Sequence, residues 1–102
     1  AGVPLARFRF LGFPPHKKGR ETFFREVATS DEASVFYESP HRLEKALASL
    51  DKLAPSRRVV LCRELTKKFE EVAHGTPAEL ISRIATNPNA SRGEFVVIVP
   101  AA

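Results

Sequence analysis

Residues 34–40, Ser34-Val35-Phe36-Tyr37-Glu38-Ser39-Pro40, predict a strand that runs directly into a helix, and the α/β architecture expected for this chain is built on that junction. Its first part is rich in β-branched and aromatic residues, which favour an extended strand. Ser39 and Pro40 form a helix start, since serine can cap the free amides of a first turn and proline loses no hydrogen bond at the first helical position.

The same alternation of strand and helix extends in both directions from this stretch. After Pro40, leucine and alanine recur at three- and four-residue spacing until Pro55 stops the pattern, which predicts an amphipathic helix. Other segments follow from the same periodicities. The predicted strands are 7–11, 34–38, 58–64, 69–74 and 94–99, of which 69–74 is the weakest, and the predicted helices begin at Arg20, Pro40 and Pro77. This order predicts one α/β domain over residues 1–102, with a mixed sheet of about five strands and three main helices.

Two local patterns add detail to these elements. The uninterrupted apolar run 59–62 is typical of a strand covered on both faces, and Cys62 within it is interpreted as a buried small hydrophobic residue. The sequence Thr76-Pro77-Ala78-Glu79 fits a capping box at the start of the last helix. Both patterns concern stability.

Composition restricts the class of protein. The chain has 102 residues, of which 43% are hydrophobic and 27% charged, as in an ordinary folded domain. No apolar run approaches the roughly 18 residues that cross a bilayer, and the first residues do not resemble a signal peptide, so we expect a cytoplasmic protein without a membrane partner. The formal charge of +4 is compatible with a polyanionic partner but is too small to demonstrate one.

Several familiar sites are absent from the sequence. The 5 glycines are scattered, so there is no glycine-rich phosphate loop. The 3 histidines and the single cysteine lack zinc-type spacing, and no Gly-x-Ser-x-Gly nucleophile elbow occurs. We therefore expect no metal site and no complete dinucleotide site within this chain.

Three polar clusters stand at predicted strand ends, where ligands of α/β proteins tend to bind. Residues 12–20, GFPPHKKGR, form a stiff turn followed by cations, which suits RNA phosphates or else a merely solvated loop. Residues 36–42, FYESPHR, deliver an aromatic ring and a carboxylate to a helix N-terminus, which suits a polar ligand or else core packing with ordinary capping. Residues 63–71, RELTKKFEE, mix both charges, and structural ion pairing is the alternative there.

These clusters, together with Gly93-Glu94, resemble the second domain of the bacterial 16S rRNA cytidine-2′-O-ribose methyltransferases, within the tetrapyrrole (corrin/porphyrin) methylase superfamily. The resemblance covers nearly the whole chain. It implies a two-domain enzyme that holds S-adenosylmethionine in the cleft between its domains, so this chain would supply one wall and be inactive alone. It also implies 16S rRNA or the small ribosomal subunit as substrate, and a homodimer that includes the N-terminal domain.

Residue roles follow from this resemblance. Glu38 and Glu64 are the candidate catalytic residues, as polar anchors or as acceptors of the hydroxyl proton. The candidate cofactor contacts are Gly12, Phe13, Tyr37 and Pro40, and the candidate RNA contacts are Lys17, Lys18, Arg42, Arg63, Thr66 and Lys67. Tyr37 is predicted to lie in the core, with stacking on a base or on adenine as the alternative.

Three other functions remain open. A corrin or porphyrin methyltransferase shares the fold and the donor, although the basic loop favours RNA. A non-enzymatic RNA-binding module would bind RNA in a salt-sensitive way without a methyl donor. A dimerisation domain would place partly exposed aromatic residues in a subunit contact, and the candidates for that contact are Phe8, Phe10, Phe13, Phe23 and Phe24.

Overall fold

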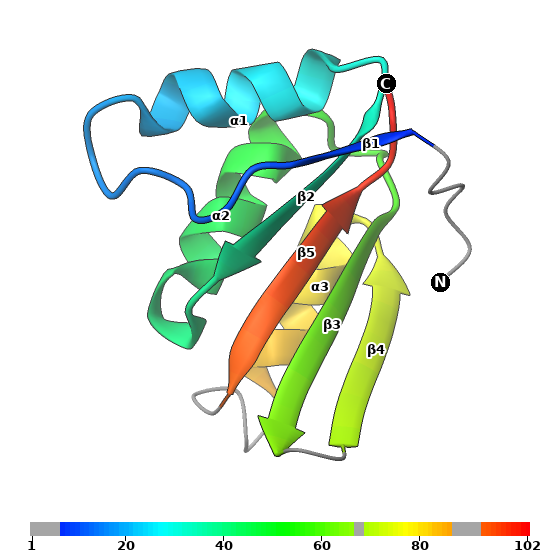
Figure 1. Ribbon diagram of the computed structural model, residues 1–102. Coiled ribbons are helices and arrows are strands. Elements are labelled where there is room, and N and C mark those ends of the chain that lie inside the picture. The colour runs from blue at the N-terminus through cyan, green and yellow to red at the C-terminus, as the bar shows by residue number, and fades with distance from the viewer. Residues whose placement is uncertain (1–6, 67–68, 87–92) are drawn as a thin grey trace.

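Strands and helices alternate along the chain in the computed structural model, which describes residues 7–66, 69–86 and 93–102 (Figure 1). The strands are β1 (Phe8–Phe10), β2 (Ala33–Glu38), β3 (Val59–Thr66), β4 (Phe69–Gly75) and β5 (Glu94–Val99), and the helices are α1 (Arg20–Thr29), α2 (Pro40–Leu53) and α3 (Pro77–Ala85). The predicted order is confirmed, and all three helices begin at the predicted residues.

The strands form one mixed sheet in the order β1-β2-β5-β3-β4. β1 is parallel to β2, whereas β5 is antiparallel to both β2 and β3, and β4 is antiparallel to β3. β1, β2 and β3 therefore point in one direction. Their carboxyl ends lie at the end of the sheet where β5 begins, and each predicted polar cluster starts at or near one of these strand ends.

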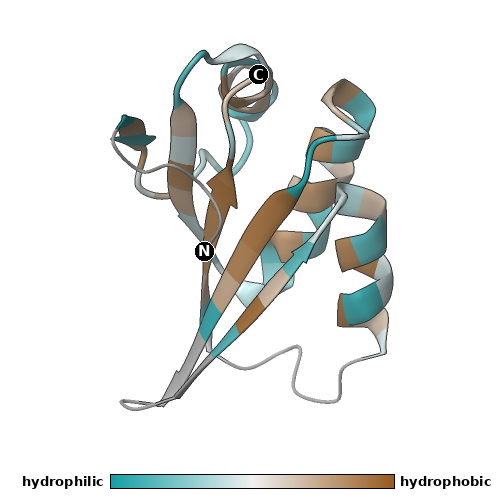
Figure 2. Ribbon diagram, turned by 90° about the vertical axis from the view of Figure 1, so that its right-hand side faces the viewer, coloured by the Kyte–Doolittle hydropathy of each residue, from teal (hydrophilic) through white to brown (hydrophobic). Residues whose placement is uncertain are grey.

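The three helices lie on one face of the sheet (Figure 1). Phe36, Leu61 and Val97 point from the strands toward the helices and are almost fully buried. Figure 2 views the molecule from its β4 side and shows hydrophobic and hydrophilic bands on the helices, as expected for elements with one buried face. Among the described residues, no helix is both long enough and apolar enough to span a membrane.

The opposite face of the sheet carries no helix in the described part of the chain, although residues 59–62 were predicted to form a strand covered on both faces. Val60 and Leu61 are nevertheless both buried, at 3% and 4% exposed. Cys62, predicted to be buried, is only partly buried. Its side chain alternates with that of Leu61 and so lies on the face away from the helices.

The two helix starts differ in how they are capped. The predicted capping box of α3 is confirmed: Thr76 Oγ1 accepts from the Glu79 N–H at 3.3 Å, and Glu79 Oε1 accepts from the Thr76 N–H at 2.9 Å. Ser39 was expected to cap α2, but its side chain makes no capping hydrogen bond. Its own N–H instead donates to Glu38 Oε1 at 3.0 Å, so the carboxylate preceding the helix takes part in this junction.

Candidate functional site at the carboxyl end of the strands

Two buried ionisable residues lie on either side of Phe95 in the sheet. Glu38 on β2 and Arg63 on β3 both pair in register with Phe95 on β5. The three side chains are 2%, 2% and 5% exposed, respectively. Charges this deeply buried need partners, because desolvation of an unpaired ion costs several kcal/mol.

Glu38 has a partner for each of its carboxylate oxygens. Arg20 Nη2 lies 3.3 Å from Oε2, and the Ser39 N–H donates to Oε1 at 3.0 Å. Arg20 also donates through Nη1 to the Pro15 carbonyl at 3.0 Å, and its guanidinium lies 5.0 Å from the centre of the Phe24 ring. This geometry favours a polar anchor over a proton acceptor, since both carboxylate oxygens are engaged.

The basic loop between β1 and α1 is held at both ends. At its start, the Gly12 carbonyl accepts from the Tyr37 N–H at 2.8 Å. At its end, the Arg20 side chain donates back to the Pro15 carbonyl. Gly12 has φ of 70°, a conformation that glycine adopts without strain. Between these anchors Lys17 and Lys18 are exposed, and neither forms an ion pair with another described residue.

Tyr37 lies on the surface, so its predicted core position is wrong. It is 39% exposed, because the alternation of β2 turns Phe36 toward the helices and Tyr37 to the other face. Its ring lies 5.1 Å from that of Phe10 and 5.3 Å from that of Phe13, between centroids. Phe10 was not among the predicted site residues, although the period-two pattern of its strand indicated that it shares a face with Phe8.

The aromatic residues proposed for a dimer contact separate into two groups. Phe8, Phe10 and Phe13 are about half exposed, at 48%, 54% and 57%. Phe24 is 0% exposed, so it is wrong as a contact residue, whereas Phe23 is partly buried against the core and keeps part of its surface exposed. The spacing of the helix face, which places both on its apolar side, already favoured burial.

Arg63, predicted to contact RNA, is buried inside the domain. Its guanidinium forms an ion pair with Glu71 and lies 5.7 Å from the centre of the Phe95 ring. This burial supports the structural ion-pair interpretation of the third cluster. Beside it is a small hollow, partly open to solvent, whose lining is Leu61, Arg63, Glu71, Ala73, Leu80, Arg83, Ile84 and Phe95.

Of the remaining predicted residues, the structure describes some in full, some by their backbone alone and one not at all. Pro40 occupies the first position of α2, and Arg42 in the same turn is partly exposed. The backbone of Glu64 pairs with Glu94 at the start of β5, but the side chains of Glu64 and Thr66 lie outside what the structure describes. Lys67 falls outside the described residues altogether. In the described part, no group of three or more His, Cys, Asp or Glu side chains is placed to hold a metal ion.

Residues 1–81 match the model of the family described as Tetrapyrrole (Corrin/Porphyrin) Methylases. A Vibrio cholerae protein named Ribosomal RNA small subunit methyltransferase I is 45% identical over 101 residues, covering 97% of this chain and 35% of its own length. Proteins of the same name from Pseudomonas aeruginosa and Halalkalibacterium halodurans are 44% and 40% identical, each over 97% of this chain and over 36% and 34% of their own lengths. The chain thus spans about a third of the length of these curated relatives.

A solved structure titled "Crystal structure of the methyltransferase CobJ" resembles the whole chain. The TM-score is 0.66 at 23% identity, and the match covers 100% of this chain and 44% of the other. At this identity the likeness concerns the fold alone. It confirms the predicted α/β architecture with a mixed five-stranded sheet.

Proposed function

Because the chain belongs to the tetrapyrrole (corrin/porphyrin) methylases, we propose that it is the C-terminal domain of an S-adenosylmethionine-dependent methyltransferase acting on small-subunit ribosomal RNA. Three relatives at 40–45% identity carry that name. The finer assignment, a cytidine ribose 2′-hydroxyl of 16S rRNA, rests on the motif resemblance. The observation that carries the choice of RNA over a tetrapyrrole is the anchored loop that presents Lys17 and Lys18 to solvent.

The donor is proposed to bind between this domain and an N-terminal domain, against Gly12 and Pro40. The space beside Gly12 is open, because a Cβ built at this position would meet no atom within 4 Å, so the domain leaves room for a ligand there. When bound, the donor supplies an electrophilic methyl group. Within this chain, the Gly12 turn and the first turn of α2 shape one wall, and the hydrogen bond from the Tyr37 N–H holds that wall in place.

The RNA is proposed to contact Lys17, Lys18 and Arg42, which lie at the same end of the sheet. Exposed cations attract phosphates and position the substrate, and correct positioning can supply up to ~7–11 kcal/mol of a reaction barrier. Glu38 serves as the anchor of this loop through Arg20. Glu64 stays the candidate acceptor for the hydroxyl proton, since its backbone lies at this end of β3 beside Glu94.

Methyl transfer from labelled S-adenosylmethionine to small ribosomal subunits lacking the modification tests this proposal, with the full-length parent protein. We expect the label on a cytidine ribose 2′ oxygen. Glu64→Gln should lower kcat by roughly 100-fold or more, as expected for loss of a general base. Arg58→Ala is a matched control, because Arg58 is an exposed cation just before β3, at the opposite end of the sheet.

A label found only on a corrin or porphyrin would replace this function with the tetrapyrrole alternative. RNA binding without any transfer of label would instead favour the non-enzymatic module. A cytoplasmic location belongs to the same proposal, because the substrate is a cytoplasmic ribosomal particle. The proposal also includes a homodimer, and sedimentation of the parent protein measures that assembly.

A further inference from the structure

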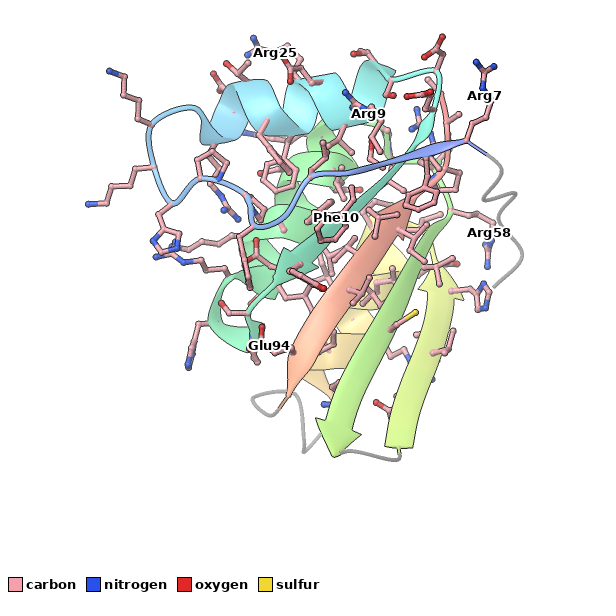
Figure 3. The ribbon with its side chains drawn as sticks, viewed as in Figure 1. Arg7, Arg9, Phe10, Arg25, Arg58 and Glu94 are labelled. Carbon is pink, nitrogen blue, oxygen red and sulfur yellow. The ribbon has the colours of Figure 1, made fainter. Side chains whose placement is uncertain are left out.

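Three aromatic rings are exposed together on the sheet face opposite the three helices. Phe10 ends β1, Tyr37 lies on β2, and Phe13 belongs to the loop that follows β1. Phe10 and Tyr37 meet edge to face, and Phe13 is tilted at 48° to Tyr37. Figure 3 shows Phe10 on the side of the sheet opposite the helices. Rings exposed as a group on one face offer an aromatic surface to a planar partner.

The backbone under these rings is fixed by hydrogen bonds. Phe10 pairs in register with Val35, and the Leu11 N–H donates to the Val35 carbonyl at 2.8 Å. The Gly12 carbonyl accepts from the Tyr37 N–H at the same distance of 2.8 Å. A surface ordered in advance loses little conformational entropy when it binds a ligand.

The exposed part of this face is aromatic at its β1 edge, whereas its aliphatic centre is buried. Val60 and Ile98 on the same face are only 3% and 7% exposed. A face prepared for a general apolar contact would leave its aliphatic centre accessible. Exposed rings beside a hydrogen-bonded strand instead match the way sheets bind single-stranded nucleic acid, by stacking bases on aromatic side chains.

The positive charge of Lys17 and Lys18 near the rings favours a planar partner that carries phosphates. Phe13 opens the loop that carries Lys17 and Lys18, and four residues of extended chain span at most about 14 Å. A single-stranded RNA segment presents bases and phosphates together, so one segment can reach both the rings and the lysines.

We infer that Phe10, Phe13 and Tyr37 form a stacking platform for unpaired bases of the ribosomal RNA substrate. The inference rests on the proposed function for the identity of that RNA. It reassigns Phe13 and Tyr37 from donor contacts to RNA contacts and adds Phe10. The platform orients the RNA, and the chemistry of methyl transfer lies elsewhere in the site.

The test uses the full-length parent protein and a single-stranded oligoribonucleotide that spans the nucleotide labelled in the methyl-transfer experiment, with 2-aminopurine beside that nucleotide. Phe10→Leu and Phe13→Leu remove the aromatic face but keep an apolar side chain, and Phe10→Tyr and Phe13→Tyr keep the ring. Val72→Ala is the matched control, because Val72 is 49% exposed on the same sheet face but is aliphatic and lies on β4. Fluorescence quenching reports stacking, and titration gives Kd.

Each leucine variant should weaken RNA binding roughly 5- to 100-fold and reduce quenching, whereas the tyrosine variants and Val72→Ala should bind like the parent. Unchanged RNA binding with a raised KM for S-adenosylmethionine would overturn the inference in favour of adenine stacking. Unchanged RNA binding with a shift from dimer to monomer in sedimentation would overturn it in favour of a second copy. A parent protein that does not methylate small subunits at all would contradict the proposed function instead, so the two failures are distinguishable.

Discussion

Glu38 and Arg63 pair in register with the same residue, Phe95, from opposite sides of β5. Each of the two also forms an ion pair with a residue on the side away from β5. Arg20 holds Glu38 from the loop side, and Glu71 on β4 holds Arg63. Two ion pairs thus flank one phenyl ring at the end of the sheet where the proposed site lies. The Arg20–Glu38 pair connects a buried charge to the loop that carries Lys17 and Lys18.

Loss of the Glu38 carboxylate should destabilise the fold. Glu38→Gln leaves Arg20, which is 14% exposed, without its counter-ion, and breaking a buried pair costs roughly 3–5 kcal/mol. In urea denaturation, the double variant Glu38→Gln/Arg20→Met should lose less free energy of unfolding than the sum of its single variants. A Glu38→Gln protein that keeps its full stability and loses only kcat would show that Glu38 is the proton acceptor.

The Arg63–Glu71 pair should respond asymmetrically to substitution. Glu71→Gln leaves the guanidinium of Arg63 buried with a weaker partner, so it should lower the free energy of unfolding by about 3 kcal/mol. Arg63→Met should cost less, because it removes the buried charge and retains volume, while the remaining Glu71 side chain is 45% exposed. Equal losses in thermal or urea denaturation would contradict this account of the buried arginine.

The salt dependence of RNA binding should separate surface cations from the buried one. Lys17→Ala should reduce the slope of log Kd against log salt concentration by about 1, as expected when one phosphate contact is lost. Arg63→Met and the control Arg58→Ala should leave that slope unchanged. A slope that falls with Arg63→Met and stays constant with Lys17→Ala would reverse the assignment of the RNA surface.

Ser39 and Thr76 each precede a helix, but their replacement by alanine should change the free energy of unfolding by very different amounts. Thr76→Ala removes an observed capping hydrogen bond and should cost about 1 kcal/mol of unfolding free energy. Ser39→Ala should cost close to nothing, because the Ser39 side chain makes no capping hydrogen bond. A comparable loss for both variants in chemical denaturation would mean that Ser39 also caps its helix.

Local patterns sufficed to predict the elements and their order. Pro40 and Pro77 begin helices as predicted, because a fixed φ and a missing N–H suit the first helical position whatever the rest of the fold does. The clusters at strand ends were predicted to carry the site, and the structure gathers the described ones at one end of the sheet. Period-two alternation also indicated which residues of a strand share a face.

The packing of distant segments sets which face of the sheet is covered and which charges are buried. Strand alternation already implied that Phe36 and Tyr37 point to opposite faces, but the packing of the helices was needed to show that Tyr37 remains exposed. The ion pair between Arg20 and Glu38 joins residues 18 positions apart, and Phe95 lies between Glu38 and Arg63 only because β5 inserts between β2 and β3. Such burial depends on contacts between distant segments, for which no local pattern of residues provides a signal.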